Sequence, residues 1–257
     1  MEDLQNYLDT RNITIDKVGI KDLKYPIILK DKVKGQQHTI AKINMYVQLP
    51  DKFKGTHMSR FIEILNQFRE NMTIESIKKI LSEMKGKLHS LSAHFDMTFT
   101  YFVEKKAPIS QTRSLMDYEC QYIASDNNNQ RDFVISVKIP VLSLCPCSKE
   151  ISDYGAHNQR SIVKISLRHT RMIWIEDIID LAEKSSSAPI YSLLKREDEK
   201  FITEKAYNNP AFVEDIVRNI AVQLLKEDRV NWFEVSSENY ESIHNHSVYA
   251  VVCRQKN

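Results

Sequence analysis

The chain has 257 residues, of which 42% are hydrophobic and 27% are charged, and this composition predicts a folded globular protein rather than a disordered one. Thirty-six Lys and Arg residues against 34 Asp and Glu residues give a formal net charge of +2, which points to neither nucleic acid nor an anionic membrane as a partner. The N-terminal stretch is polar from its first turn, and no apolar run approaches the roughly 18 residues of a membrane helix. We therefore expect a cytoplasmic protein.

The first half of the chain shows strand and helix patterns in turn. Residues 41–49 place alternate apolar side chains on one face, which predicts a half-buried strand. Apolar residues recur at three-to-four spacing in 56–68 and 73–88, which predicts two helices with Thr56 and Thr73 as N-caps. Alternation then returns in three stretches that predict consecutive antiparallel strands, at residues 95–105, 118–124 and 133–141.

The second half repeats this succession after an interruption. Residues 160–168 predict a strand, 174–184 a short helix, and 209–228 a longer helix with Asn209 at the N-cap and Pro210 at the first helical position. The charged stretch KREDEKFITEK between the two helices is typical of a solvated loop. Two strands close the chain, at residues 229–235 and 247–253.

The order of these elements is a weak internal duplication. A strand, two helices and three strands are followed by a strand, two helices and two strands. This order predicts an α+β protein made of two related halves, each an antiparallel sheet with helices packed on one face. We divide the chain into an N-terminal extension at 1–35, a first unit at 36–142 and a second unit at 143–257, which together form a single compact fold.

One stretch, LCPCSKEISDYGAHNQR, interrupts the strand pattern with Cys145, Cys147 and His157. In extended backbone the two thiols would point the same way, toward a histidine that the turn at Gly155 brings back. The chain has only four cysteines, and it lacks both the paired knuckles of a zinc ribbon and the base-deaminase pattern. A Cys–His nucleophilic pair remains open, as do two packed cysteines beside a surface histidine.

Polar residues near the C-terminus form a second group of candidates. His244 and His246 lie two apart at the mouth of a predicted strand and so share a face, with Glu241 just before them. Glu214 falls in the first turn of the helix at 209–228, beside its apolar stripe, where the helix dipole favours a carboxylate. A solvated glutamate is the commoner outcome for such a position.

Five separated blocks, in the right order, resemble the type IB GTP cyclohydrolase I family: KGTHMSRFIEIL, EKKAPIS, PVLSLCPCSKEISDYGAHNQRS, YSLLKREDEKFITEKAYNNPAFVEDIVR and NYESIHNHSVYA. The resemblance implies a tunnelling fold (T-fold), here as two fused units in one chain. It implies conversion of GTP and water to 7,8-dihydroneopterin 3'-triphosphate and formate, the first step of folate and deazapurine biosynthesis. A homotetramer with active sites at subunit interfaces is the assembly it implies.

The resemblance also implies roles for individual residues. By motif, Cys145, His157 and Glu199 would hold a divalent metal, and manganese, zinc or iron would serve. Glu214 would hold the guanine base. A thiolate, an imidazole and a carboxylate leave one coordination position open for water, as catalytic metal sites do.

The remaining implied residues line the pocket or bind the triphosphate. Cys147, Glu241, His244 and His246 would join Cys145 and His157 as the catalytic set. The triphosphate needs cations, and the candidates are Lys54, Arg60, Lys105 and Lys106. The alternative is a T-fold protein that binds or processes another purine or pterin without cyclohydrolase activity.

Overall fold

The computed structural model describes Gln5 and residues 7–256 of the chain. The helices and strands are, in chain order, β1 (Ile15–Asp31), β2 (Gly35–Leu49), α1 (Met58–Phe68), α2 (Ile74–Lys87), β3 (Ser92–Lys106), β4 (Arg113–Asn127), β5 (Gln130–Leu144), α3 (Pro146–Ile151), β6 (Asn158–His169), α4 (Ile175–Ser185), β7 (Ala188–Pro189), α5 (Arg196–Asn208), α6 (Val213–Lys226), β8 (Val230–Asn239) and β9 (Val248–Gln255). Among the described residues, no helix has the length and apolar character needed to cross a membrane.

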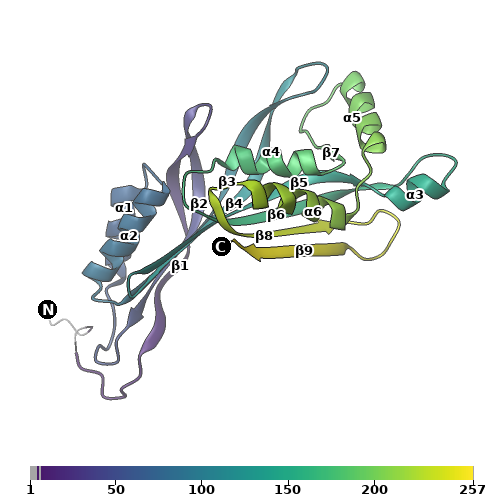
Figure 1. The fold of residues 1–257 in the computed structure, drawn as a ribbon. Coiled ribbons are helices and arrows are strands. Elements are labelled where there is room, and N and C mark those ends of the chain that lie inside the picture. Colours follow the sequence, from purple (N-terminus) through teal and green to yellow (C-terminus); the bar gives the residue numbers. More distant parts are fainter. Residues whose placement is uncertain (1–4, 6, 257) are drawn as a thin grey trace. The chain divides into compact units, whose positions relative to one another are not determined.

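The strands pair in the order β1-β2-β3-β4-β5-β6-β8-β9, and the short β7 pairs with β5 (Figure 1). The pairs β1–β2, β2–β3, β6–β8 and β8–β9 are antiparallel. The chain forms two compact units, one of Met1–Thr100 with Gln121–Ile135 and one of Tyr101–Cys120 with Ser136–Asn257. Strands β3, β4 and β5 therefore each contribute residues to both units.

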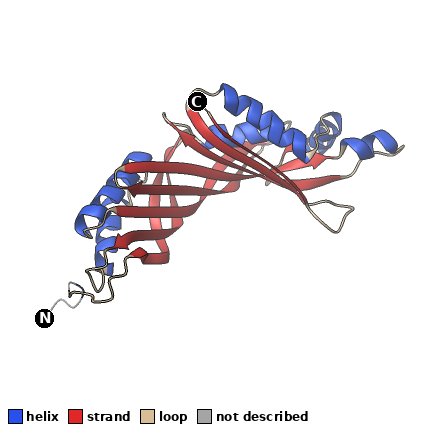
Figure 2. Ribbon diagram, turned by 60° about the horizontal axis from the view of Figure 1, so that its bottom comes forward, coloured by secondary structure: helices blue, strands red, loops and turns tan. Residues whose placement is uncertain are grey.

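In the first unit, α1 and α2 cover one face of the strands (Figure 2). Alternate residues of β2 are buried, including Ile43, Met45 and Val47, which confirms the strand predicted at 41–49. Phe61 of α1 and Ile80 of α2 are also fully buried, as the helical spacing of their apolar neighbours predicts.

The two predicted helix caps of this unit have different outcomes. Thr73 is the N-cap of α2, and its hydroxyl accepts a hydrogen bond from the Ser76 amide, so that prediction is confirmed. The prediction that Thr56 caps α1 is wrong, because the helix begins at Met58 and His57 is its N-cap residue. Thr56 is instead buried.

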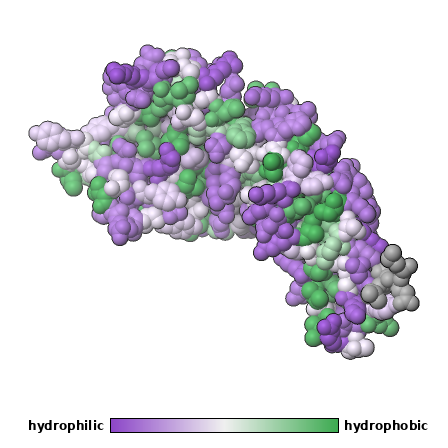
Figure 3. Space-filling view, turned by 180° about the vertical axis from the view of Figure 1, so that it is seen from behind, coloured by the Kyte–Doolittle hydropathy of each residue, from purple (hydrophilic) through white to green (hydrophobic). Residues whose placement is uncertain are grey.

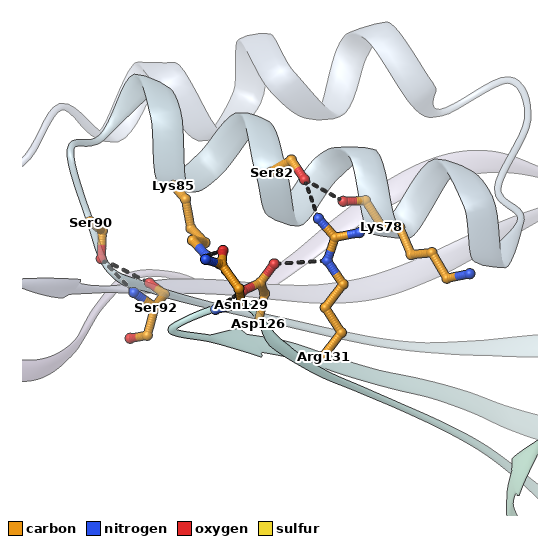
Figure 4. Close-up of polar contacts among 8 residues, drawn as sticks. All are labelled: Lys78, Ser82, Lys85, Ser90, Ser92, Asp126, Asn129 and Arg131. Carbon is orange, nitrogen blue, oxygen red and sulfur yellow. Dashed lines mark hydrogen bonds and ion pairs between the residues drawn. The ribbon is translucent and has the colours of Figure 1, made fainter.

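A buried carboxylate ties α2 to the turn between β4 and β5 (Figure 4). Asp126 is 1% exposed and accepts hydrogen bonds from Lys85 at 2.6 Å, from Arg131 at 2.9 Å and from the Asn129 amide at 3.1 Å. Arg131 also donates to Ser82 of α2 at 3.0 Å. Charged partners on both sides offset the desolvation of the carboxylate, and the helix is thereby fixed to the hairpin.

In the second unit, the core lies between β6, β8 and helices α4 and α6. Val163 and Ile165 of β6, Phe233 and Val235 of β8, and Ile216 of α6 are all fully buried. Hydrophobic residues that are exposed lie among hydrophilic ones on the face that Figure 3 shows. The apolar side chains that recur at regular spacing in these elements thus form this core.

Helix α5 was not predicted, because its sequence is dominated by charged residues. Asp198 fixes the start of this helix: it is fully buried and accepts hydrogen bonds from the Ile109 and Ser110 amides, the Ser110 hydroxyl and the Lys195 amide, at 2.6–2.9 Å. Burial alone would raise the pKa of Asp198, but the hydrogen bonds from Ser110, Lys195 and Ile109 hold that pKa well below its ordinary value.

The existence of α5 also changes the start of the next helix. Asn209 ends α5 as its C-cap residue, so the prediction that Asn209 caps the following helix is wrong. Helix α6 begins at Val213, and Phe212 is the N-cap residue, whose amide donates to the Asp215 carboxylate at 3.0 Å.

The order of two strands, two helices and two strands occurs twice in the chain. The first copy is β1-β2-α1-α2-β3-β4, and the second is β5-β6-α4-α6-β8-β9 with α3, β7 and α5 added. Strand β1 lies inside the predicted N-terminal extension, and register shifts near Ile15 and Ile20 break its alternation. The boundary between residues 142 and 143 stays a prediction.

Candidate active site

A cavity of about 250 Å³ lies in the second unit, and all its lining residues belong to that unit. They come from the end of β5, the start of β6, the first turn of α6 with the residues before it, and the segment from the end of β8 to the start of β9. Six of the residues predicted from the sequence line this cavity: Cys145, His157, Glu214, Glu241, His244 and His246.

Cys145 and His157 are held together by the backbone. The Cys145 amide donates to the His157 carbonyl at 3.1 Å. Ser148 adds a second link, since its hydroxyl accepts from the His157 amide at 3.1 Å and donates to the Cys145 carbonyl at 3.2 Å. Gly155 has φ of +118°, a conformation that side chains disfavour, and its turn returns the chain to His157.

The two cysteines of this stretch differ in position. Cys145 is the N-cap residue of α3, and its sulfur accepts from the Ser148 amide at 3.4 Å. Pro146 occupies the first turn, where its missing N–H removes no helical hydrogen bond. Cys147 therefore lies in a helix and not in extended backbone as expected, and it is exposed and does not line the cavity.

The His157 imidazole faces two polar side chains. Its Nδ1 atom lies 3.0 Å from Gln159 Oε1 and 3.9 Å from Glu241 Oε2. The side chains of His157 and Glu241 are only 13% and 10% exposed. The Gln159 side-chain oxygen opposite Nδ1 favours the tautomer that carries a proton on that nitrogen.

Glu214 lies in the first turn of α6, where it is exposed to solvent and lines the cavity. At the same helix end, the Asp215 carboxylate accepts the hydrogen bond from the amide of the N-cap residue, so Glu214 is not needed for capping. The unsatisfied N–H groups of a helix start favour negative charge nearby. This environment keeps a carboxylate at the edge of the cavity.

His244 and His246 lie in the loop between β8 and β9, together with Glu241. Their rings are stacked, with centroids 5.3 Å apart and planes inclined by 23°. The two imidazoles thus share one side of the loop, just before the start of β9, in agreement with their predicted place at the mouth of a strand.

Glu199 does not line the cavity in this chain, although it belongs to the same unit. It lies in the first turn of α5 and is exposed, directly after the buried Asp198.

The four predicted triphosphate-binding cations lie elsewhere. Lys105 forms an ion pair with Glu183 at 2.7 Å and donates to the Ile190 carbonyl at 2.7 Å. Burial lowers the pKa of the Lys105 ammonium, an effect that Glu183 only partly offsets. Lys106 is exposed and does not line the cavity. Lys54 and Arg60 belong to the first unit, where Arg60 donates to the Lys87 carbonyl.

The cavity contains the kinds of donor that bind a divalent metal. Cys145 offers a thiol, His157 an imidazole and Glu241 a carboxylate, a donor set that suits zinc, iron or manganese. Across the described residues, however, no group of three or more His, Cys, Asp or Glu side chains is arranged closely enough to hold an ion. Cys145 and His157 therefore fit a metal through the chemistry of their side chains.

Three polar residues of the cavity were not identified from the sequence: Ser143, Gln159 and Asn239. Ser143 and Gln159 stand two residues from Cys145 and His157, so the alternation of strand side chains was the available signal for both. Asn239 stands two residues before Glu241, so the same spacing was available for it, although its hydrogen-bond partner Ser143 is far away in the sequence.

Comparison with known proteins gives consistent matches. A family model described as "Type I GTP cyclohydrolase folE2" matches residues 1–250. The chain is 57% identical over 256 residues to GTP cyclohydrolase FolE2 of Geobacter sp. (strain M21), with 100% of this chain and 96% of the relative covered. It is 54% identical over 256 residues to the protein of the same name from Nitrosococcus oceani, with 100% and 96% covered.

Solved structures that match this fold include urate oxidases. The urate oxidase from Bacillus sp. TB-90 matches with a TM-score of 0.55 and 8% identity over 94% of this chain and 100% of that chain. Uricase from Arthrobacter globiformis matches with a TM-score of 0.52 and 8% identity over 93% of both chains. At such identities the likeness concerns the fold alone, and it confirms the predicted tunnelling fold.

Proposed function

Because the chain belongs to the family of type I GTP cyclohydrolases described as folE2, we propose that it converts GTP and water to 7,8-dihydroneopterin 3'-triphosphate and formate. This reaction opens the biosynthesis of folate and of deazapurines. The observation that carries the proposal is the single cavity lined by Cys145, His157 and Glu214 together. It combines a group suited to guanine with a thiol and an imidazole suited to the reacting end of the purine. The finer assignment to type IB is supported by the five sequence blocks that resemble that subtype.

Glu214 supplies selectivity for guanine in this proposal. A carboxylate can accept hydrogen bonds from both the N1–H and the exocyclic amine of guanine, whereas adenine offers no such pair of donors. Rejection of adenine then results from an unpaired carboxylate, which is a strong form of discrimination. The position of Glu214 at the open end of α6 supports this role.

Cys145 and His157 hold a divalent metal in this proposal, with Glu199 as the third ligand and manganese, zinc or iron as the ion. When bound, such an ion supplies an activated water molecule near neutral pH. Glu241 is a further carboxylate close to His157. The assignment of Glu199 as a ligand rests on the sequence resemblance alone, because its side chain does not line the cavity.

Opening of the purine ring requires protons at the departing nitrogen atoms. The stacked His244 and His246 are suited to deliver them, because imidazoles exchange protons near neutral pH. Glu241 orients the neighbouring His157, and Cys147 remains a candidate for proton relay on the resemblance alone.

The site is proposed to lie at a subunit interface in a homotetramer. No Lys or Arg occurs among the described residues that line the cavity, although a triphosphate requires cations. A neighbouring subunit can supply them, with Lys54, Arg60, Lys105 and Lys106 as candidates. All four cysteines are free, which supports a cytoplasmic location.

The test is an activity and metal assay on the purified protein. GTP with manganese, zinc or iron should yield a fluorescent pterin after oxidation, together with an equal amount of formate. Cys145→Ala and His157→Ala should each abolish turnover and lower the bound metal measured by elemental analysis. Cys253→Ala is the matched control, since that exposed thiol on β9 lies outside the cavity.

Turnover by either cavity variant at the wild-type rate would refute the ligand assignment. Tight binding of GTP without product, under any of the three metals, would instead favour a T-fold protein that binds purines or pterins without cyclohydrolase activity.

A further inference from the structure

A chain of buried hydrogen bonds runs through the wall of the cavity, since Ser143, Asn239 and Ala211 all line it. The Ser237 hydroxyl donates to Asn239 Oδ1 at 3.4 Å, Asn239 Nδ2 donates to the Ser143 hydroxyl at 3.1 Å, and that hydroxyl donates to the Ala211 carbonyl at 3.0 Å. Ser143 and Ser237 are fully buried, and Asn239 is 2% exposed. Polar groups buried this deeply are costly unless each one is paired.

The direction of this chain follows from its last member. A carbonyl oxygen only accepts, so the Ser143 hydroxyl must donate its proton to Ala211. Ser143 then accepts from the Asn239 amide NH₂, which leaves the Asn239 carbonyl oxygen to accept from Ser237. Every bond has one possible donor, and the orientation of the Asn239 amide is therefore fixed.

The chain joins the three segments that carry the candidate site. Ser143 stands two residues before Cys145, Ala211 stands three residues before Glu214, and Asn239 stands two residues before Glu241. A backbone bond from the Ala211 amide to the Leu144 carbonyl, at 3.1 Å, strengthens the first junction. The start of α6 is thus fastened to the end of β5 on one side of the cavity.

We propose that Asn239 and Ser143 are positioning residues, which set the spacing between the carboxylate of Glu214 and the pair Cys145 and His157. This inference rests on the proposed function, since it assigns the guanine to one end of the cavity and the reacting carbon to the other. If both ends of a purine must be held at once, a small shift of α6 against β5 misplaces the reacting atoms while the base remains bound.

The geometry assigns Asn239 to positioning rather than to substrate contact. Its amide oxygen and nitrogen are both used inside the protein, by Ser237 and Ser143. Only 2% of the residue is exposed, although it borders the cavity. It acts on the reaction through Ser143 and Ala211.

The test compares Ser143→Ala and Asn239→Leu with Ser136→Ala. Ser136 is the matched control, because it is a buried serine on the same strand, 3% exposed, with its hydroxyl 3.0 Å from that of Ser166 and outside the cavity. Wild-type turnover is established first, so that failure of the proposed function would be seen as a wild type without product.

The expected result is a division between kinetic constants. Ser143→Ala and Asn239→Leu should lower kcat by about 10- to 100-fold while KM for GTP changes by less than about threefold. Ser136→Ala should leave both constants near wild type, even where it lowers the thermal midpoint. The double variant of Ser143 and Asn239 should lower kcat by no more than the more damaging of the two single variants, because both residues act in one chain.

The proposal is overturned if Ser136→Ala lowers kcat as much as Ser143→Ala does, since a general loss of rigidity would then be the cause. It is also overturned if kcat stays at the wild-type value in Ser143→Ala. Should Asn239→Leu fail to fold, Ser143→Ala still decides the question, because it removes a single oxygen atom.

Discussion

The position of Glu214 in the first turn of helix α6 makes its carboxylate available for binding a ligand. It lies at the second position of α6, where its neighbour Asp215 already satisfies the cap by accepting from Phe212. The Glu214 carboxylate is exposed and borders the cavity. A carboxylate without a structural duty, at a helix end that favours negative charge, is available to a ligand.

At this scale we predict that Glu214→Ala weakens GTP binding by about 100-fold, since two hydrogen bonds to a charged acceptor are worth about 3 kcal/mol together. Isothermal titration calorimetry with GTP measures the change. Glu197→Ala is the matched control, because Glu197 is also an exposed first-turn glutamate but lies on α5, outside the cavity. Equal GTP affinity in wild type and Glu214→Ala would exclude the guanine-binding role.

The proximity of Cys145 to His157 could be predicted and the role of Asn239 could not, and the two cases differ in one physical respect. Cys145 and His157 belong to one short stretch, and a tight turn at Gly155 joins them, so their proximity could be predicted. Asn239 meets Ser143 across 96 positions of sequence. Its role depends on the pairing of distant strands, and no local pattern contains that information.

Among the elements, helix ends were harder to predict than helix interiors. The apolar spacing of α1, α2, α4 and α6 was sufficient to predict them. Helix α5 was missed because its buried residues are few, namely Asp198, Ile202 and Ala206. Helix α3 has six residues, which is too short for a periodic pattern. The cap of α6 was then misplaced, since Asn209 serves the end of α5 instead.

The confirmed cap of α2 allows a prediction at this scale. Thr73→Ala should lower the free energy of unfolding by about 1 kcal/mol, because the Ser76 amide loses its acceptor and the capping box is broken. Urea denaturation followed by circular dichroism measures this change. Thr203→Ala, an exposed position inside α5, should change stability by less than about 0.5 kcal/mol. An equal loss in both variants would mean that the capping bond contributes nothing specific.

For the molecule as a whole, the repeated order of elements and the sequence blocks were enough to predict a tunnelling fold of two related halves. The compact units could not be predicted, because β3, β4 and β5 each pass from one unit into the other. Membership of a unit is decided by contacts between distant residues. The most deeply buried aspartate among the described residues of the first unit is Asp126, and that of the second unit is Asp198.

These two aspartates make stability depend on pH in a defined direction. Burial would raise the pKa of Asp126, but hydrogen bonds from Lys85 and Arg131 lower it below its ordinary value, and the pKa of Asp198 is lowered as well. A carboxyl group with a lower pKa in the folded state stabilises that state fully above its unfolded pKa, near 3.8. This contribution is lost as the pH falls through the folded-state pKa.

We therefore predict that the contribution of Asp126 and Asp198 to the free energy of unfolding is constant near neutral pH and falls once the pH drops below about 4. Asp126→Asn should be less stable than wild type at neutral pH by about 2 kcal/mol, because Lys85 and Arg131 lose a charged partner. Both Asp126→Asn and Asp198→Asn should show a weaker dependence on pH in the acid range. Urea midpoints measured from about pH 3 to pH 7 test this dependence.

Hydrogen exchange followed by mass spectrometry locates the effect within each unit. Asp126→Asn should speed exchange in α2 and the turn between β4 and β5, since its hydrogen bonds join those segments. Asp198→Asn should do so in α5 and at Ile109 and Ser110. Asp51→Asn is the control, because Asp51 is exposed and should alter neither the acid dependence nor the exchange. An acid dependence that is identical in wild type and both buried-aspartate variants would show that other groups control unfolding at low pH.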